Sequence, residues 1–355
     1  MAAGAHFGVS CGWEFPEWFA GNEPAPTPIA DFARQPSFPI VAREHRAVRE
    51  AVGVLDMSLM GKLLVQGPHA VAVLSRLSAN DIDREVGRVV YTQWLDPRGG
   101  IAADVTVTRQ ADDRFCVVAS DLIQRRIEPM VRRATAPGEF VTVTDITAGV
   151  TILSVQGPRS RELLQPLTDT DLSNESFPYL TGKDTHVGNA AVWVSRVTYV
   201  GELGFELHVP TDQAAGLYDL LMDEGAPLGI RPVGLSAMAS LRLEKGYRDM
   251  GVDIDNTDTP LDAGLGFAVA WDKPGGFIGL DALLAARAAG PPRHRVLSLV
   301  VHDPDADLFG SADPAKSYAV AELIVGGKAV SRTIVERLVP KDMAYPDPGL
   351  TMRRS

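Results

Sequence analysis

Three short stretches of this sequence combine glycines with ionisable side chains in patterns that suit a small-molecule site. The first is Gly99-Gly100-Ile101-Ala102-Ala103-Asp104, which ends in a carboxylate at the start of an expected strand. Two glycines let the backbone turn tightly or approach a ligand closely, and a single carboxylate at a strand start can face a cavity. Aspartate in this position also caps turns in many proteins. The local sequence therefore leaves two interpretations of Asp104 open, a catalytic carboxylate and a turn cap.

The second stretch is Tyr199-Val200-Gly201-Glu202-Leu203-Gly204-Phe205-Glu206. Glu206 lies in a half-apolar, strand-like run, where a carboxylate needs a partner or a ligand. A carboxylate accepts a planar pair of N–H donors, such as the 2-aminopyrimidinone edge of a pterin. The alternative is a side chain that faces solvent on an alternating strand.

The third stretch runs from Leu241 to Gly251 and contains Arg242, Lys245 and Arg248 at i, i+3 spacing. On a helix this spacing gives one basic stripe, which would end near Gly246. Such a stripe could meet an anionic group such as the glutamate tail of folate. Such a stripe is more often a solvated helix face.

Other chemistries lack their sequence signals. No GxGxxG run occurs, so a dinucleotide fingerprint for FAD or NAD is missing, and neither GxxxxGK[ST] nor HExxH is present. The two cysteines, Cys11 and Cys116, form no CxxC, and the seven histidines are dispersed. We therefore predict no metal site, no disulfide framework and no bound flavin.

The elements that would position these stretches follow a repeat. A strand-like run over 62–68 precedes a helical run over 69–77, and the same pattern returns over 151–158 and 159–167. Both copies contain Gln-Gly-Pro, at 66–68 and at 156–158, which is an offset of 90 residues (156 − 66). Pro at the first helical position is typical of a strand-to-helix turn. The repeat predicts two related α+β halves.

Further runs complete an α+β fold with a small C-terminal β domain. Residues 44–54 have helical spacing, whereas the Pro- and aromatic-rich segment 1–40 predicts an irregular arm. We expect strands over 88–95, 99–109 and 114–120, two strands within 190–210, helices over 212–224 and 234–246, and a β-rich segment from 291 to 304.

Composition limits the partners. The chain has 355 residues and a formal net charge of −11, which disfavours nucleic acid because binding to a phosphate backbone needs clustered Lys and Arg. No apolar run approaches the ~20 residues that span a bilayer, and residues 1–20 lack a secretory signal pattern. We expect a cytoplasmic protein that binds neither membrane nor nucleic acid.

Together these motifs resemble the folate-binding aminomethyltransferase (T-protein) family. The resemblance covers roughly residues 40–310 and is closest to the folate-binding C-terminal half of dimethylglycine and sarcosine dehydrogenases. The runs that carry it are REHRAVREAVGVLDMS, KLLVQGPHA, PRGGIAADVTV, TILSVQGPRSRELL, SRVTYVGELGFELHVP, LRLEKGYRDMGVDIDNTDTPLDAGLGFAV, EKGYR, WDKPGGFIG and VHDPDADLFG.

The resemblance implies a three-domain clover-leaf with tetrahydrofolate at its centre and a C-terminal β-barrel-like domain. It divides the chain into an arm (1–40), a folate-binding catalytic region (41–288) and a C-terminal β domain (289–355), which departs from the family pattern over 331–355. It also implies roles for individual residues: a catalytic Asp104, pterin contacts from Tyr199 and Glu206, a folate-proximal Arg242, and Val118 in a strand that lines the pocket.

The function that the resemblance implies is transfer of a methyl or methylene group from an amine or onium donor to tetrahydrofolate. A second hypothesis is a flavin-free folate subunit that receives the product of a separate flavin dehydrogenase. A third, of another class, is a non-catalytic folate-binding regulator, against which the presence of Asp104 argues.

Overall fold

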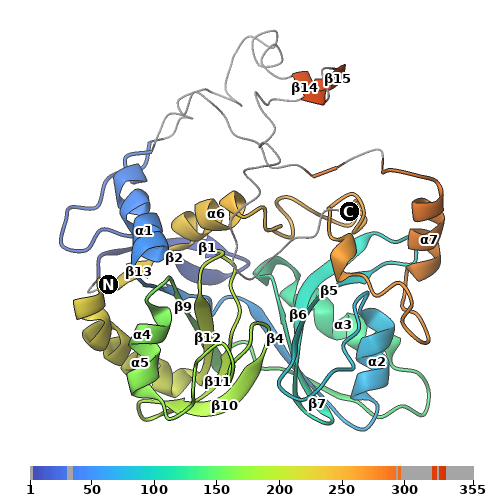
Figure 1. Cartoon of the computed structure of the whole chain (residues 1–355), viewed down its shortest axis with the longest axis horizontal. Helices are drawn as coiled ribbons and strands as arrows, with labels where there is room; N and C mark the ends of the chain where they lie inside the picture. The colour runs from blue at the N-terminus through green and yellow to red at the C-terminus, as the bar shows by residue number, and fades with distance from the viewer. Residues whose placement is uncertain (1–2, 30–34, 293–294, 297–321, 326–327, 333–355) are drawn as a thin grey trace.

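Two β-sheets dominate the computed structural model, which describes residues 3–29, 35–292, 295–296, 322–325 and 328–332 (Figure 1). The first half contains β4 (Gly61–Gln66), α2 (Ala70–Leu77), β5 (Val89–Leu95), β6 (Ile101–Ala111), β7 (Arg114–Ala119), α3 (Gln124–Ala134) and β8 (Thr142–Asp145). The second half contains β9 (Val150–Gln156), α4 (Ser160–Leu164), β10 (Gly182–Val187), β11 (Ala190–Ser195), β12 (Gly204–Pro210) and α5 (Thr211–Gly225).

The remaining elements lie before, between and after the two halves. They are β1 (Ala5–Ser10), β2 (Trp13–Phe19), α1 (Phe38–Glu50), β3 (Gly53–Asp56), β13 (Arg231–Val233), α6 (Leu235–Glu244), α7 (Leu280–Ala288), β14 (Glu322–Val325) and β15 (Lys328–Arg332). Short 3-10 helices in the described part of the chain span Asp121–Ile123, Gln165–Leu167, Ala226–Leu228 and Gly266–Ala268.

The strand orders confirm the predicted repeat. One sheet runs β5-β6-β7-β4-β8 and the other runs β10-β11-β12-β9-β3-β13. The first four strands of each sheet follow the same order, and each half continues from its first strand directly into a helix. The pairing of Gln66 with Arg114 and of Gln156 with Gly204 also aligns β7 with β12 at an offset of 90 residues (204 − 114).

Glycine is required at both strand-to-helix turns. Gly67 and Gly157 have φ values of 132° and 131°, outside the range that L side chains favour. A Cβ on Gly67 would lie 2.6 Å from the Phe140 carbonyl oxygen, and one on Gly157 would lie 2.5 Å from that of Ala51. The prolines that follow occupy the turn itself, since α2 begins at Ala70 and not at the proline. This corrects the prediction that proline is the first helical residue.

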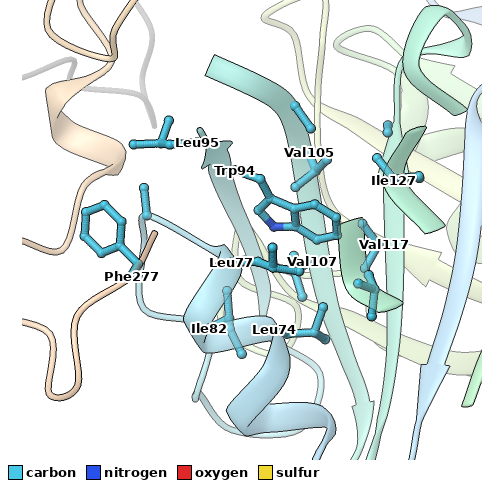
Figure 2. Packing of buried hydrophobic residues seen from close by; sticks show 14 of the residues in the cluster. Leu74, Leu77, Ile82, Trp94, Leu95, Val105, Val107, Val117, Ile127 and Phe277 are labelled. Atoms are coloured by element: carbon cyan, nitrogen blue, oxygen red, sulfur yellow. The ribbon is translucent and has the colours of Figure 1, made fainter. Parts of the chain in front are cut away.

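Each sheet buries one face against its own helices. In the first half, Trp94, Leu74 and Ile127 are fully buried members of a cluster between β4–β7 and helices α2 and α3 (Figure 2). Phe205 and Leu207 of β12 belong to a second cluster with residues of α4 and α5. Because side chains alternate along a strand, the intervening residues of both sheets point away from these cores.

The N-terminal segment differs from the predicted irregular arm. β1 and β2 form an antiparallel hairpin, in which Trp18 is buried with only 3% of its surface exposed. The helix predicted over 44–54 is α1, which begins at Phe38 and ends at Glu50 before β3 starts at Gly53. An early proline, Pro39, is compatible with a helix start because the first N–H groups of a helix have no intrahelical partner.

The C-terminal predictions fall largely outside the described residues. The described residues exclude 293–294, 297–321 and 333–355. The β-rich segment over 291–304 and the departure from the family pattern over 331–355 therefore stay predictions. Strands β14 and β15 pair antiparallel within this region.

Candidate functional site

Asp104 lies on β6, on the face of the first sheet that points away from its core. Its neighbours Ala103 and Val105 are buried in the core, whereas Asp104 is half-buried and lies opposite Gln93 of β5. The Gln93 Nε2 donates to Asp104 Oδ1 at 2.8 Å, and the Tyr91 hydroxyl donates to Asp104 Oδ2 at 3.0 Å. Both contacts come from neutral groups, and Asp104 forms no ion pair within the described residues.

The turn before β6 is capped by another residue. Asp96 Oδ1 accepts hydrogen bonds from the backbone N–H of Arg98 at 2.7 Å and of Gly100 at 3.1 Å. Asp104 contacts the neighbouring strand instead. The turn-cap interpretation of Asp104 is therefore wrong, because the sequence holds a separate aspartate that performs this task.

Burial changes the ionisation of Asp104. Loss of solvent raises its pKa to about 6, while the hydrogen bonds from Gln93 and Tyr91 oppose the rise and the nearby Asp249 carboxylate adds to it. A carboxyl group with a pKa near the working pH can exchange a proton in catalysis.

Tyr199 lies close to this carboxylate. Its hydroxyl donates to the Arg248 carbonyl oxygen at 2.7 Å, and its ring stacks on Tyr247 with centroids 6.0 Å apart. Burial raises the pKa of Tyr199 well above its ordinary value, and the carboxylates of Asp249 and Asp104 raise it further. The structure thus brings Tyr199 and Asp104, predicted from separate stretches, into one half-buried group.

Glu206 lies where the two sheets face each other. Its Oε2 is 3.7 Å from Nε2 of His208, two residues further along the same face of β12. Burial lowers the pKa of His208, but contacts with Cys116 of β7 and with Glu206 outweigh this effect and raise the pKa to about 9. Glu206 also raises the pKa of Lys62 of β4, although burial lowers it more, to about 8. Glu206 is therefore partly buried beside groups from both halves.

Val118 connects the two parts of the site. It is half-buried on β7, pairs with Lys62 of β4 and with Thr106 of β6, and packs against a small apolar cluster that includes residues of the second sheet, α1 and α6. Thr106 is two residues from Asp104 on the same strand face. Val118 therefore lies between the surroundings of Asp104 and those of Glu206.

The predicted basic stripe does not exist as a solvated helix face. Helix α6 ends at Glu244, and Arg242 is only 5% exposed, with its guanidinium bonded to Asp253 and 3.7 Å from Asp249. Arg248 lies beyond the helix and donates to backbone carbonyl groups, including that of Ala263 at 3.0 Å. The acidic residues of the following loop fold back onto α6 and draw its arginine inward.

Tyr91, Gln93 and Asp249 complete the site and were missed as candidates. The i, i+2 spacing of Tyr91 and Gln93 in an expected strand already places them on one face. Sequence alone gives no sign that this face pairs with Asp104, because register depends on the β5–β6 connection.

A separate hollow on the described surface lies away from these residues. It has a volume of about 470 Å³ and is lined by residues of β10, β11 and α5 such as Val187, Ala190 and Leu217. None of the residues that line it is ionisable, in contrast to the group around Asp104.

Comparison with known proteins identifies the family. Residues 1–273 match the family profile described as GCVT N-terminal domain. The chain belongs to the GCVT (aminomethyltransferase) family. The predicted resemblance is confirmed, and with it the membership of this chain in a family of one-carbon transferases.

Individual relatives agree with this assignment. The chain is 39% identical over 302 residues to 4-methylaminobutanoate oxidase (formaldehyde-forming) of Paenarthrobacter nicotinovorans, a match that covers 85% of this chain and 36% of the oxidase. It is 35% identical to mitochondrial dimethylglycine dehydrogenase of Homo sapiens, covering 84% of this chain and 34% of the dehydrogenase. The chain thus spans about a third of the length of these relatives.

Shorter relatives are covered more fully. Aminomethyltransferase of Caldanaerobacter subterraneus subsp. tengcongensis is 34% identical over 295 residues, which is 82% of this chain and 75% of the relative. The crystal structure of glycine cleavage system aminomethyltransferase T from Bartonella henselae aligns with a TM-score of 0.68 and 30% identity, over 81% of this GCVT chain and 73% of that one. The mixed α and β fold of the GCVT family is therefore confirmed.

Among the described residues, no group of three or more His, Cys, Asp or Glu side chains is arranged to hold a metal ion. Their helices are also too short or too polar to cross a bilayer.

Proposed function

We propose that this GCVT-family chain transfers a methyl or methylene group from an amine or onium donor to tetrahydrofolate. The observation that carries the proposal is the half-buried Asp104, which is held by two neutral donors and lies beside Tyr199. Relatives of this chain that are named aminomethyltransferases support this class of reaction.

The residues of the site suit a reduced folate. Tyr199 and Tyr247 form a stacked aromatic pair, beside which a flat heterocycle could pack. Glu206 has a carboxylate that is 22% exposed, so part of it remains available to N–H donors such as the pterin edge. The Nε of Arg242 is buried without a partner among the described residues, which leaves one donor unused near the same group.

Tetrahydrofolate would supply the nitrogen nucleophile, and the protein would supply position and charge. Ionised Asp104 orients an N–H of the bound amine and stabilises positive charge that develops as the donor carbon is transferred. When the folate nitrogen bonds to the transferred carbon, the bond from that carbon to the donor nitrogen or sulfur would break, and the donor would leave as a neutral amine or sulfide. A pKa of about 6 would let Asp104 hold the proton that the folate nitrogen loses. Gln93 and Tyr91 keep the carboxylate in place throughout.

A second candidate is a folate subunit that works with a separate flavin dehydrogenase. The observation that favours it is that the relatives of this chain include an oxidase and a dehydrogenase. In this case the donor would be the oxidised amine that the flavin protein releases.

Folding into the complete three-domain clover-leaf and residence in the cytoplasm remain parts of the proposal.

The assay is formation of methyl- or methylene-tetrahydrofolate from a panel of N-methyl amines and onium compounds. Formaldehyde serves as a control because it condenses with tetrahydrofolate without an enzyme. Turnover with free donors supports the transferase. Turnover only after addition of a flavin dehydrogenase and its substrate supports the subunit. If the protein binds folate but shows no turnover under either condition, the proposal is overturned and the hypothesis of a non-catalytic folate-binding regulator remains.

A further inference from the structure

The side chain of Gln93 is an unusual component of the β5–β6 sheet. It is fully buried, yet its strand neighbours on either side, Thr92 and Trp94, point into the opposite core face. Its Nε2 donates to Asp104 at 2.8 Å and its amide also contacts the Tyr91 hydroxyl. Its Oε1 is buried and has no hydrogen-bond partner among the described residues.

An unpaired buried acceptor opposes folding, because the oxygen loses its water and gains no donor in exchange. An apolar side chain of similar volume, such as methionine, would fill the same space without this loss. The contacts that Gln93 does make are directed to the candidate catalytic carboxylate and its second donor, Tyr91. The position of the amide therefore suits a task at Asp104 better than a task in the core.

We propose that Gln93 is the positioning residue of the site, which holds the Asp104 carboxylate in its ionised form and in one orientation. The inference rests on the proposed function only for its effect on rate, since the contact itself exists without substrate. Register supports it: Gln93 and Asp104 are directly paired on antiparallel strands, so the backbone fixes the amide against the carboxylate.

The charges around Asp104 make such a donor necessary. Tyr91 from β5, Tyr199 from the second half and Asp249 from the loop after α6 all face it, and Arg248 lies near Tyr91. Burial and the Asp249 carboxylate both raise the pKa of Asp104, whereas the hydrogen bond from Gln93 is the first of the two contacts that lower it. Removing that bond leaves only Tyr91 to oppose burial.

The test is the pKa of Asp104, measured by carbon NMR on protein labelled at the aspartate carboxyl groups, with Asp104→Asn identifying the signal. In the wild type we expect a midpoint of about 6. In Gln93→Met the midpoint should rise by roughly one pH unit, because one donor to the charged form is lost. The acidic limb of the pH–rate profile should move by the same amount. The melting temperature should not fall, since the unpaired Oε1 is removed.

Two comparisons keep the result decisive. Thr92→Val changes a buried polar residue on the same strand but on the core face, so it should leave the Asp104 midpoint unchanged. Gln93→Asn shortens the amide side chain by one methylene and replaces the Met variant if that variant fails to fold. It should also raise the Asp104 midpoint. An unchanged Asp104 midpoint in folded Gln93 variants would overturn the proposal, whatever the assay for one-carbon transfer gives. A shifted midpoint without any transferase activity would retain the role of Gln93 and reject the proposed function.

Discussion

At the scale of single residues, the site depends on where carboxylates lie more than on how many there are. The chain carries 45 acidic residues, and most of them can remain in water. Asp104 differs because a strand face holds it half-buried, and this burial raises its pKa to about 6 although its two neutral hydrogen-bond donors oppose the rise. Asp96, eight residues earlier, is bonded to backbone N–H groups and to Arg98, and its pKa is lowered.

This contrast gives a matched pair of variants. Asp104→Asn removes the charge with little change of shape, and loss of one preorganised electrostatic group typically lowers turnover by ~10²–10³-fold. Asp96→Asn should retain turnover, because asparagine also caps turns. The rate at which the folate product forms is measured for both variants, and thermal melting confirms that each variant folds. Equal turnover of wild type and Asp104→Asn would remove the catalytic role.

Glu206 offers a second pair. Glu206→Ala should weaken tetrahydrofolate binding by roughly 30- to 150-fold, which corresponds to about 2–3 kcal/mol for a charge-assisted hydrogen-bonded pair. Glu202 lies four residues earlier and pairs with Arg49 at 3.0 Å, so Glu202→Ala is expected to keep the affinity. Isothermal calorimetry compares the two variants, and unchanged binding by Glu206→Ala would exclude this residue from the pterin contact.

At the scale of elements, one carboxylate joins three segments. Glu44 of α1 is 3% exposed, and its two oxygens accept from the backbone N–H of Phe19 in β2 at 2.6 Å and of Gly234 before α6 at 2.9 Å. Burial raises the pKa of Glu44 to about 7, although both hydrogen bonds oppose the rise. The hairpin, α1 and α6 are therefore joined through a group that titrates near neutral pH.

The sign of the pH effect follows from this shift. Between pH 4.5 and about 7 the folded state holds the Glu44 proton and the unfolded state does not, so stability falls as pH rises through this window. The loss can reach about 3 kcal/mol, at 1.36 kcal/mol per pKa unit. Glu44→Gln has no proton to lose, so its free energy of unfolding should lack this component.

Chemical denaturation from pH 4 to 8 measures the difference between the two proteins. Glu50→Gln, on the exposed side of the same helix, should follow the wild type. A constant difference between wild type and Glu44→Gln across this range would contradict the buried-carboxylate explanation.

At the scale of the whole molecule, the repeat brings two non-equivalent faces together. The offset of 90 residues places Cys116 and Val118 of β7 in the positions that Glu206 and His208 occupy in β12. The contact between Cys116 and His208 joins these two strands across the interface. One half supplies Asp104 and the other supplies Glu206 and Tyr199, so a ligand that contacts all three must bridge the halves.

A bridging ligand should stabilise the fold. At a concentration of 100 times its Kd, tetrahydrofolate adds about 2.7 kcal/mol to the free energy of unfolding, which is a rise of about 4 °C in Tm for a chain of this size. Glu206→Ala should lose most of this rise at the same ligand concentration, whereas Asp104→Asn should keep it. Differential scanning fluorimetry provides the measurement, and an equal rise in the Glu206 variant would place the ligand outside the proposed site.

The sequence by itself determined the elements and the family. Glycine turns, alternating strands and the repeated Gln-Gly-Pro run depend on local backbone preferences, so the two halves could be recognised before their packing was known. The N-terminal hairpin was missed because Pro and aromatic residues concealed a short strand pair, and α3, β10 and α7 were not predicted either. Asp104 became a candidate because it follows a two-glycine turn, whereas Tyr199 and Glu206 became candidates through their spacing in one strand-like run and the family resemblance.

Only the tertiary structure decided which side chains share one environment. The register of β5 against β6 brings Gln93 and Tyr91 to Asp104, and a one-residue slip would turn both toward the core. Arg242, for which the sequence left a folate-facing and a solvated position open, is buried because the loop that carries Asp249 and Asp253 folds back over α6. These outcomes depend on contacts between residues distant in the chain, whose strength comes from burial, and burial is a property of the packed fold and not of the local sequence.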